Sequence, residues 1–191
     1  MSRKGIILAG GNGTRLYPLT SSISKQLLPV YNKPMVYYPL STLMSANIQE
    51  ILIISSPKHM SLYKSMFGNG DDYGISISYE IQEKPRGIPE AFIIGEDFIG
   101  KDSVCLILGD NIFYGGNLEE LLLKATISNF SSIFSSEVKD PERFGVVELD
   151  QNNEILNVVE NQFVEESFYL CLQHRVLLLQ TSHLNIFHFV I

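Results

Sequence analysis

The sequence predicts an α/β protein with a mainly parallel sheet, and three observations support this fold class. Short continuous apolar runs, typical of strands buried on both faces, recur at residues 5–9, 50–55 and 104–108. Segments of helical length separate these runs, and several end at a glycine. Polar or glycine-rich residues follow the runs, where parallel sheets bind their ligands. Alternation of strand and helix is typical of a parallel sheet covered by helices.

The first elements follow from local signals. The run at residues 5–9 predicts a buried strand. We expect a helix over residues 33–46, because Lys33-Pro34 places a proline where a missing N–H costs nothing, with Pro39 able to kink it. Residues 50–55 predict a second buried strand, and residues 57–67 predict a helix that ends at Gly68.

The later elements follow the same logic. Residues 75–79 alternate between apolar and polar side chains, which predicts a strand. A helix over residues 88–98, closed by Gly100, leads to a buried strand at residues 104–108. After these we expect a helix at residues 118–129 and strands at residues 131–138, 145–149 and 155–159.

Size and composition limit the function classes. A chain of 191 residues with 45% hydrophobic residues forms one domain with a sizeable core, with room for an appendage. The net charge of −7 argues against a nucleic acid polymer as partner. Cys105 and Cys171 have neither a metal-binding nor a disulfide spacing, and we expect Cys105 to be a buried thiol. The first strand starts almost at once and the apolar C-terminal stretch is too short to span a bilayer, so we expect no signal peptide, no membrane association and a cytoplasmic location.

The glycine-rich stretch after the first strand indicates a phosphate site. Gly10, Gly11 and Gly13 let the backbone approach a ligand, and their N–H groups can point at phosphate oxygens. Thr14 and Arg15 follow directly, and Arg15 adds a planar cation suited to phosphate. The glycines alone fit an ordinary strand-to-helix turn equally well.

Known phosphate motifs do not account for this stretch. No Gly-Lys-Ser/Thr ends it, so it is not a Walker A loop. A dinucleotide fingerprint would need a glycine where Leu16 stands. Lys25 and Gln26 follow ten and eleven residues after Arg15, and we expect Lys25 to return a second cation to the same site.

Two other predicted strands end in polar motifs. Gln82 and Gly87 follow the strand at residues 75–79, and an amide and a glycine N–H can hydrogen-bond a base edge. A plain surface loop explains them as well. Asp110 follows the strand at residues 104–108 beside a glycine, which suits a Mg²⁺ ligand but also a helix N-cap or an Asx turn.

The pattern GGxGTRLxPLT…SKQLLPV…KPMVYYPL resembles the sugar-1-phosphate nucleotidylyltransferase family, from Met1 to about Glu160. The resemblance implies a Rossmann-like three-layer nucleotidyltransferase fold whose C-terminal part is missing here. Within the family the match is to members that transfer a thymidylyl group from dTTP to glucose 1-phosphate, with Mg²⁺, giving dTDP-glucose and pyrophosphate. It also implies a place in dTDP-rhamnose or other deoxysugar synthesis for surface polysaccharide. Such enzymes are often homotetramers.

The resemblance also implies site residues. Arg15, Lys25 and Asp110 would be catalytic: Arg15 neutralises pyrophosphate, Lys25 bridges the substrates' phosphates, and Asp110 (in LGDNIFYG) holds Mg²⁺. Gly145 and Glu160 would bind the sugar phosphate together with Lys25. The implied nucleotide-binding residues are Leu8, Gly10, Gly11, Gly13, Thr14, Arg15, Gln26, Gln82 and Gly87. Of these, the glycines 10, 11 and 13 would cradle the triphosphate, Gln26 would face the deoxyribose, and Gln82 and Gly87 would recognise the thymine.

The resemblance stops after Glu160, where the family continues with Lys-Pro and this chain continues Asn161-Gln162. The segment 161–191 contains none of the chain's 14 glycines or 8 prolines, although average usage predicts about four there. Glu-Lys-Pro can be encoded GAA AAA CCA, and loss of one A gives GAA AAC CA-, which reads Glu-Asn-Gln when the next base is A or G. We therefore interpret residues 1–160 as a nucleotidyltransferase domain and 161–191 as a frameshifted tail, with a divergent terminus as the alternative.

Three other functions compete with this interpretation. A UTP-using sugar nucleotidylyltransferase is a close rival, but family members of that kind usually show Lys-Glu where this chain has Lys25-Gln26. The truncated chain could also be inactive, or bind nucleotide only, since the family's second metal-binding aspartate is missing. An NAD-dependent oxidoreductase is excluded by Leu16 and by Ser55-Ser56, where an acidic residue would be needed.

Overall fold

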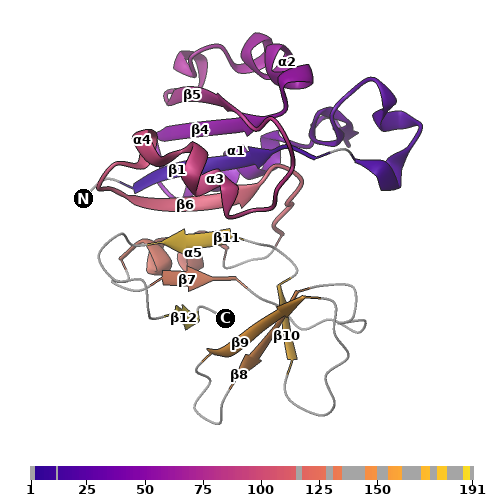
Figure 1. Ribbon diagram of the computed structural model, residues 1–191. Helices are drawn as coiled ribbons and strands as arrows, with labels where there is room; N and C mark the ends of the chain where they lie inside the picture. The colour runs from indigo at the N-terminus through magenta and orange to yellow at the C-terminus, as the bar shows by residue number, and fades with distance from the viewer. Residues whose placement is uncertain are drawn as a thin grey trace.

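A computed structural model describes the chain over most of its first 134 residues and over several later strands. Its main feature is a seven-stranded sheet in the order β12-β7-β11-β6-β1-β4-β5 (Figure 1). A three-stranded sheet, β10-β8-β9, and a two-stranded hairpin, β2-β3, accompany it. The described residues are 3–11, 13–114, 118–127, 131–134, 145–149, 155–160, 169–172, 176–179 and 187–189.

Four parallel strands form the core of the main sheet: β6 (Ser103–Leu108), β1 (Arg3–Ala9), β4 (Glu50–Ser55) and β5 (Ser76–Ile81). Within this group Ile6 of β1 lies opposite Leu52 of β4 and Leu106 of β6. All four strands match predicted ones to within two residues at each end. The predicted class, α/β with a mainly parallel sheet, is confirmed.

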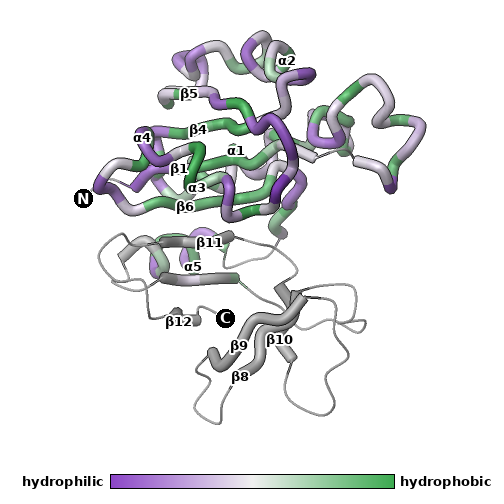
Figure 2. The backbone as a smooth tube through the Cα atoms, in the orientation of Figure 1, coloured by the Kyte–Doolittle hydropathy of each residue, from purple (hydrophilic) through white to green (hydrophobic). Residues whose placement is uncertain are grey.

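Helices cover both faces of this sheet, which gives the predicted three layers. Ile7 packs in one core with side chains of α1 (Tyr37–Ser45), α2 (Pro57–Phe67) and α5 (Leu118–Ile127). Ile6, on the opposite face because strand side chains alternate, packs with α3 (Glu90–Ile94) and α4 (Glu96–Ile99). The central strands β6, β1 and β4 are accordingly mostly hydrophobic along their length (Figure 2).

Two predicted helices differ from the observed ones. The helix predicted from Lys33 begins only at Tyr37, because β3 (Lys33–Pro34) pairs with β2 (Pro29–Val30) in a hairpin. A residue before proline is biased to extended backbone, and this bias favours the strand at Lys33. The helix predicted over residues 88–98 is two short helices that meet at Gly95, a residue that weakens a helix interior.

The later strands only partly follow the prediction. β7 (Ser131–Ile133), β8 (Gly145–Leu149) and β9 (Ile155–Glu160) lie where strands were expected, and residues 135–138 and 128–129 of the predicted elements lie outside the described part. The segment 161–191, for which no strand was predicted, contributes three strands. These are β10 (Tyr169–Leu172), β11 (Val176–Leu179), which pairs antiparallel with β6, and β12 (Phe187–Phe189).

Two smaller predictions concern single features. Cys105 is buried as expected, and burial raises the pKa of its thiol to about 12. None of the helices in the described ranges combines the length and hydropathy needed to cross a bilayer.

Candidate active site

The four parallel strands bring their C-terminal ends to one edge of the sheet, and backbone hydrogen bonds continue past these ends. The N–H of Gly109 donates to the carbonyl of Leu8 at 2.9 Å, and the N–H of Gln82 donates to the carbonyl of Ser55 at 2.9 Å. The Ser55 hydroxyl donates to the carbonyl of Ala9 at 3.1 Å. The loops after β1, β5 and β6 are therefore held side by side where parallel sheets bind ligands.

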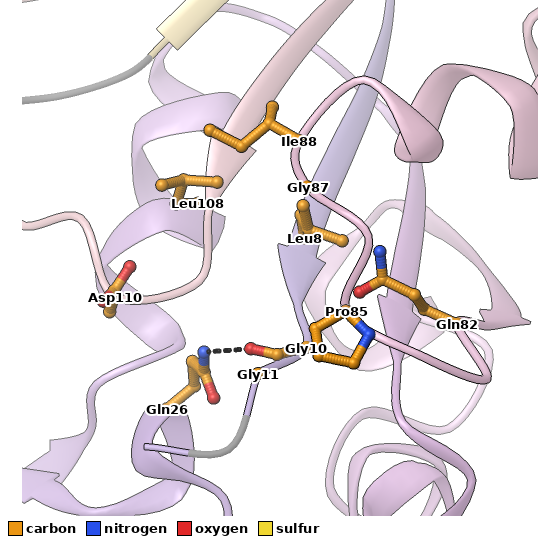
Figure 3. Close-up of a pocket in the computed structure, with 10 residues that line it drawn as sticks. All are labelled: Leu8, Gly10, Gly11, Gln26, Gln82, Pro85, Gly87, Ile88, Leu108 and Asp110. Carbon is orange, nitrogen blue, oxygen red and sulfur yellow. Dashed lines mark hydrogen bonds between the residues drawn. The ribbon is translucent and has the colours of Figure 1, made fainter. Parts of the chain in front are cut away.

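A pocket of about 230 Å³ opens between these loops (Figure 3). This volume is below the roughly 300–1,000 Å³ of sites that hold a whole drug-sized ligand, so the pocket suits one part of a larger ligand, such as a base with its sugar. Seven of its ten lining residues were predicted as nucleotide or metal residues: Leu8, Gly10, Gly11, Gln26, Gln82, Gly87 and Asp110.

Gln82 lies on one wall and is held from behind by Glu90. Its Nε2 donates to Glu90 Oε2 at 2.8 Å, and the backbone N–H of Arg86 donates to the same oxygen at 3.3 Å. Because a carboxylate only accepts, the Gln82 atom that faces it must be the nitrogen, and Oε1 is the atom left for the pocket. That oxygen lies so close to Gly10 that a Cβ at Gly10 would collide with it.

Gln26 lies on the opposite wall, 5% exposed, although it belongs to a separate segment, the 3₁₀ helix Lys25–Leu27. Its Nε2 donates to the carbonyl of Gly10 at 3.1 Å (Figure 3). Gly10 is therefore close to both amide side chains, and a side chain at this position would disturb both walls.

Lys25 and Asp110 form an ion pair beside the pocket. Lys25 Nζ lies 2.7 Å from Asp110 Oδ2, and both side chains are about one third exposed, so solvent screens the attraction. The cation predicted for phosphate and the carboxylate predicted for the metal thus neutralise each other here. A phosphate and a metal ion could take over these two contacts in exchange.

Asp110 is the one predicted metal ligand, and its surroundings bear on that role. Among the described residues no group of three or more His, Cys, Asp or Glu side chains could hold a metal ion. A single carboxylate nevertheless fits Mg²⁺, which commonly uses one or two carboxylates together with substrate phosphates and water. The residues present therefore suit a metal held jointly by the protein and its ligand.

Several predicted residues lie outside the pocket lining. Thr14 and Arg15 belong to the 3₁₀ helix Thr14–Leu16, and both are exposed. Gly13 accepts a hydrogen bond from Thr20 Oγ1 through its carbonyl, at 2.8 Å. Gly145 and Glu160 lie opposite each other in the β8–β9 pair, in the three-stranded sheet. The roles implied for these five residues remain predictions.

Sequence reasoning missed four features of the site. Pro85, Ile88 and Leu108 also line the pocket, and each lies within three residues of a predicted site residue. Their apolar character gave no chemical signal, although their neighbours did. Glu90 was also missed, because its contact with Gln82 spans eight residues and no motif marks it.

A three-layer fold with glycines, amides and an ion pair at its strand ends is typical of an α/β protein that binds its ligand at this edge of the sheet. Residues 4–165 match the family model described as nucleotidyl transferase. The chain belongs to this nucleotidyl transferase family.

Two relatives show which members of the family this chain resembles in sequence. The chain is 56% identical over 158 residues to a glucose-1-phosphate thymidylyltransferase of Neisseria meningitidis, covering 82% of this chain and 55% of the relative. It is 48% identical over 166 residues to one of Mycobacterium tuberculosis, covering 87% of this chain and 58% of the relative. The chain thus spans slightly more than half the length of these relatives.

Solved structures agree on the fold. A Bacillus anthracis protein assigned as a glucose-1-phosphate thymidylyltransferase, in complex with sucrose, has a TM-score of 0.83 and 37% identity. The match covers 94% of this chain and 72% of that one. A UTP-bound UGPase from Acinetobacter baumannii, with a TM-score of 0.79 over 93% of this chain and 74% of that one, is only 19% identical and supports the fold alone.

Proposed function

We propose that this chain carries the nucleotide-binding part of a glucose-1-phosphate thymidylyltransferase. The reaction is attack of a glucose 1-phosphate oxygen on the α-phosphorus of dTTP. The bond from that phosphorus to the oxygen bridging to the β-phosphate breaks, giving dTDP-glucose and pyrophosphate. The observation that carries the proposal is the pocket at the strand ends, where seven residues predicted for nucleotide or metal binding meet.

Base recognition follows from the direction in which Gln82 is held. Glu90 occupies its nitrogen, so Gln82 offers an oxygen acceptor toward the pocket. Thymine carries an N–H at ring position 3 between two carbonyls, whereas cytosine has a bare acceptor nitrogen there. An acceptor at Gln82 and a nearby backbone N–H at Gly87 therefore complement thymine and disfavour cytosine. Leu8, Pro85, Ile88 and Leu108 would provide the apolar contact that the ring needs.

Charge neutralisation would provide most of the catalysis, since the sugar phosphate is already a nucleophile and no protein nucleophile is required. Lys25 would leave Asp110 to hold phosphate oxygens of both substrates in line. Arg15, exposed on its 3₁₀ helix, would neutralise the departing pyrophosphate. Gly145 and Glu160 would seat the glucose from the paired strands β8 and β9.

A divalent metal ion is general in this family, and we propose Mg²⁺ for this chain. Asp110 would hold it once Lys25 has moved to phosphate. When bound, Mg²⁺ supplies positive charge beside the triphosphate oxygens.

Pyrophosphate release tests the proposal. The purified 191-residue chain is incubated with dTTP, glucose 1-phosphate and Mg²⁺, and a Lys25→Ala variant serves as the inactive control. Release well above that control supports the proposal, and UTP in place of dTTP is expected to give less product. Equilibrium dialysis with labelled dTTP, run in parallel, distinguishes a chain that only binds nucleotide from one that does neither.

We further propose that the segment 161–191 is read out of frame. Its support is compositional, namely the lack of glycine and proline together with the Glu-Asn-Gln reading at residues 160–162. The family match ends at residue 165. Sequencing the DNA across codons 160–162 tests this, and a run of A with Lys-Pro in the adjacent frame is the expected result. If the adjacent frame does not encode Lys-Pro at this point, the segment 161–191 is a divergent terminus.

A further inference from the structure

A chain of buried hydroxyl groups lies behind the pocket and ends on Gln26. Tyr63 of α2 is fully buried, and Ser24 is 2% exposed. The Tyr63 hydroxyl lies 3.1 Å from Ser24 Oγ, and Ser24 Oγ in turn donates to Gln26 Oε1. Tyr63 is not among the residues that line the pocket, and Ser24 links its hydroxyl to Gln26, which is. Its hydroxyl also has Ser55 as a hydrogen-bonding neighbour.

Hydrogen-bond chemistry fixes the direction of the chain. Gly10 offers a carbonyl, which only accepts, so the Gln26 atom facing it is Nε2 and the atom facing Ser24 is Oε1. Ser24 has one hydroxyl hydrogen and gives it to Gln26. In the contact between the two hydroxyls Tyr63 is therefore the donor, because Ser24 has no second hydrogen to give. The order of donation is Tyr63 to Ser24 to Gln26 to Gly10.

This order leaves one hydrogen of Gln26 available. An amide nitrogen carries two hydrogens, and one is used on Gly10. The other meets no acceptor among the residues that the structure describes, and Gln26 lines the pocket. Gln26 therefore faces a ligand as a donor, whereas Gln82 across the pocket faces it as an acceptor.

Packing and protonation keep the chain in place. The backbone at Gly109 lies against Gln26, and a Cβ there would come within 2.9 Å of Gln26 Cγ. Burial raises the pKa of Tyr63 to about 12, so its hydroxyl keeps the donor hydrogen throughout the neutral range. Tyr63, Ser24 and Gln26 are all buried and each is hydrogen-bonded within the chain, which favours one orientation of the Gln26 amide.

We propose that Tyr63 and Ser24 are positioning residues that hold Gln26 as a hydrogen-bond donor toward a sugar oxygen of the bound nucleotide. The inference rests on the proposed function for the identity of the ligand. The orientation of Gln26 in the free protein can be tested without it.

The first test is a double-mutant cycle on dTTP affinity. Tyr63→Phe removes one hydroxyl and is expected to weaken dTTP binding roughly two- to tenfold, the value of one hydrogen bond. In a Gln26→Ala background the same change should have no further effect, because the group it positions is gone. Equal losses in both backgrounds would mean that Tyr63 acts on general stability, and would overturn the inference.

Tyr79→Phe is the matched control. Tyr79 also donates through its hydroxyl, to the carbonyl of Gly68 at 2.6 Å, but away from the pocket. It is expected to leave dTTP affinity unchanged. Ser24→Ala breaks the same chain at its next member and replaces Tyr63→Phe if that variant does not fold.

The second test needs no ligand. The Gln26 side-chain amide should give a distinct ¹H–¹⁵N pair in the free protein, assigned by its loss in Gln26→Ala. Tyr63→Phe or Ser24→Ala should shift this pair, and Tyr79→Phe should not. An unchanged pair overturns the inference, whatever the wild type binds. If the variants shift this pair but the wild-type protein binds no dTTP, the hydroxyl chain is supported and the proposed function is contradicted.

Discussion

The two parts of the predicted nucleotide site differ in how they are built. The amide part, Gln26 and Gln82 around Gly10, is buried, lies at strand ends and is held by hydrogen bonds from behind. The loop part, Thr14 and Arg15, is exposed and lies outside the pocket lining. Gln26 of the amide part and the loop part belong to the same motif-rich stretch, residues 8–30, yet only the amide part is assembled without a ligand.

This difference indicates that the amide part and the loop part contribute to different steps, the first to nucleotide binding and the second to turnover. Groups fixed before binding lose little freedom on binding and can select among bases. Exposed charged groups contribute only when phosphates reach them. We therefore expect substitutions in the amide part to change nucleotide affinity, and those in the loop part to change turnover alone.

The largest effect is expected where the two parts meet, at Lys25. Lys25→Ala should lower pyrophosphate release by at least about 100-fold, the usual cost of losing one charge-stabilising group. Lys124→Ala is a matched control, since Lys124 pairs with Glu120 at the same 2.7 Å but on the surface of α5. Similar losses in both variants would show that the effect is not local.

Gly10→Ala should be the most damaging change for binding itself. The added methyl would displace Gln82 Oε1, the end of a flexible side chain, so the fold can adjust while the base contact is lost. We expect dTTP to bind roughly 10- to 100-fold more weakly, or about 1.4 to 2.8 kcal/mol, with little change in Tm. In a Gln82→Ala background the same substitution should add little, and a full further loss there would contradict this explanation.

Glu90→Gln should have a moderate effect. It keeps the size of the side chain but replaces a charged acceptor for Gln82 Nε2 with a neutral one, and charged hydrogen bonds are the stronger kind. The Kd for dTTP should rise roughly two- to tenfold. Glu96→Gln, at an exposed position of α4, should leave the Kd unchanged. Unaltered affinity in Glu90→Gln would show that Gln82 needs no support.

Arg15→Ala should have the smallest effect on binding. Because its guanidinium is exposed, Tm should stay the same, and surface changes of this kind typically cost less than about 0.5 kcal/mol. The affinity for dTMP, which lacks the β- and γ-phosphates, should stay within about twofold, while pyrophosphate release falls. A large loss of dTMP binding would place Arg15 in the amide part.

The sequence predicted the fold well where local signals and burial agree. The strand at residues 50–55 and the helix at residues 57–67 were predicted with their observed ends, because a continuous apolar run and a proline-to-glycine segment mark them. The start of the helix at Tyr37 was missed because a pairing across four residues, Pro29 with Pro34, decides it. Helix propensity, which depends on local sequence, cannot predict such pairing between strands.

The site shows the same limit. Residues with distinctive chemistry, such as Gln82 and Asp110, could be selected from their motifs. Their supporting partners could not, since Glu90 and Tyr63 act through contacts that only the tertiary structure creates. Sequence patterns thus identified most of the residues that line the pocket, and packing determined how each of them is held.

The most direct test of this division is to map dTMP binding by ¹H–¹⁵N chemical shifts. We predict shifts in the backbone amides of Gly10, Gly11 and Gly87 and in the side-chain amides of Gln26 and Gln82. The amides of Thr14 and Arg15 should stay in place with dTMP and shift only with dTTP and Mg²⁺. Shifts centred on Thr14 and Arg15 with dTMP, or none at the strand ends, would contradict the account.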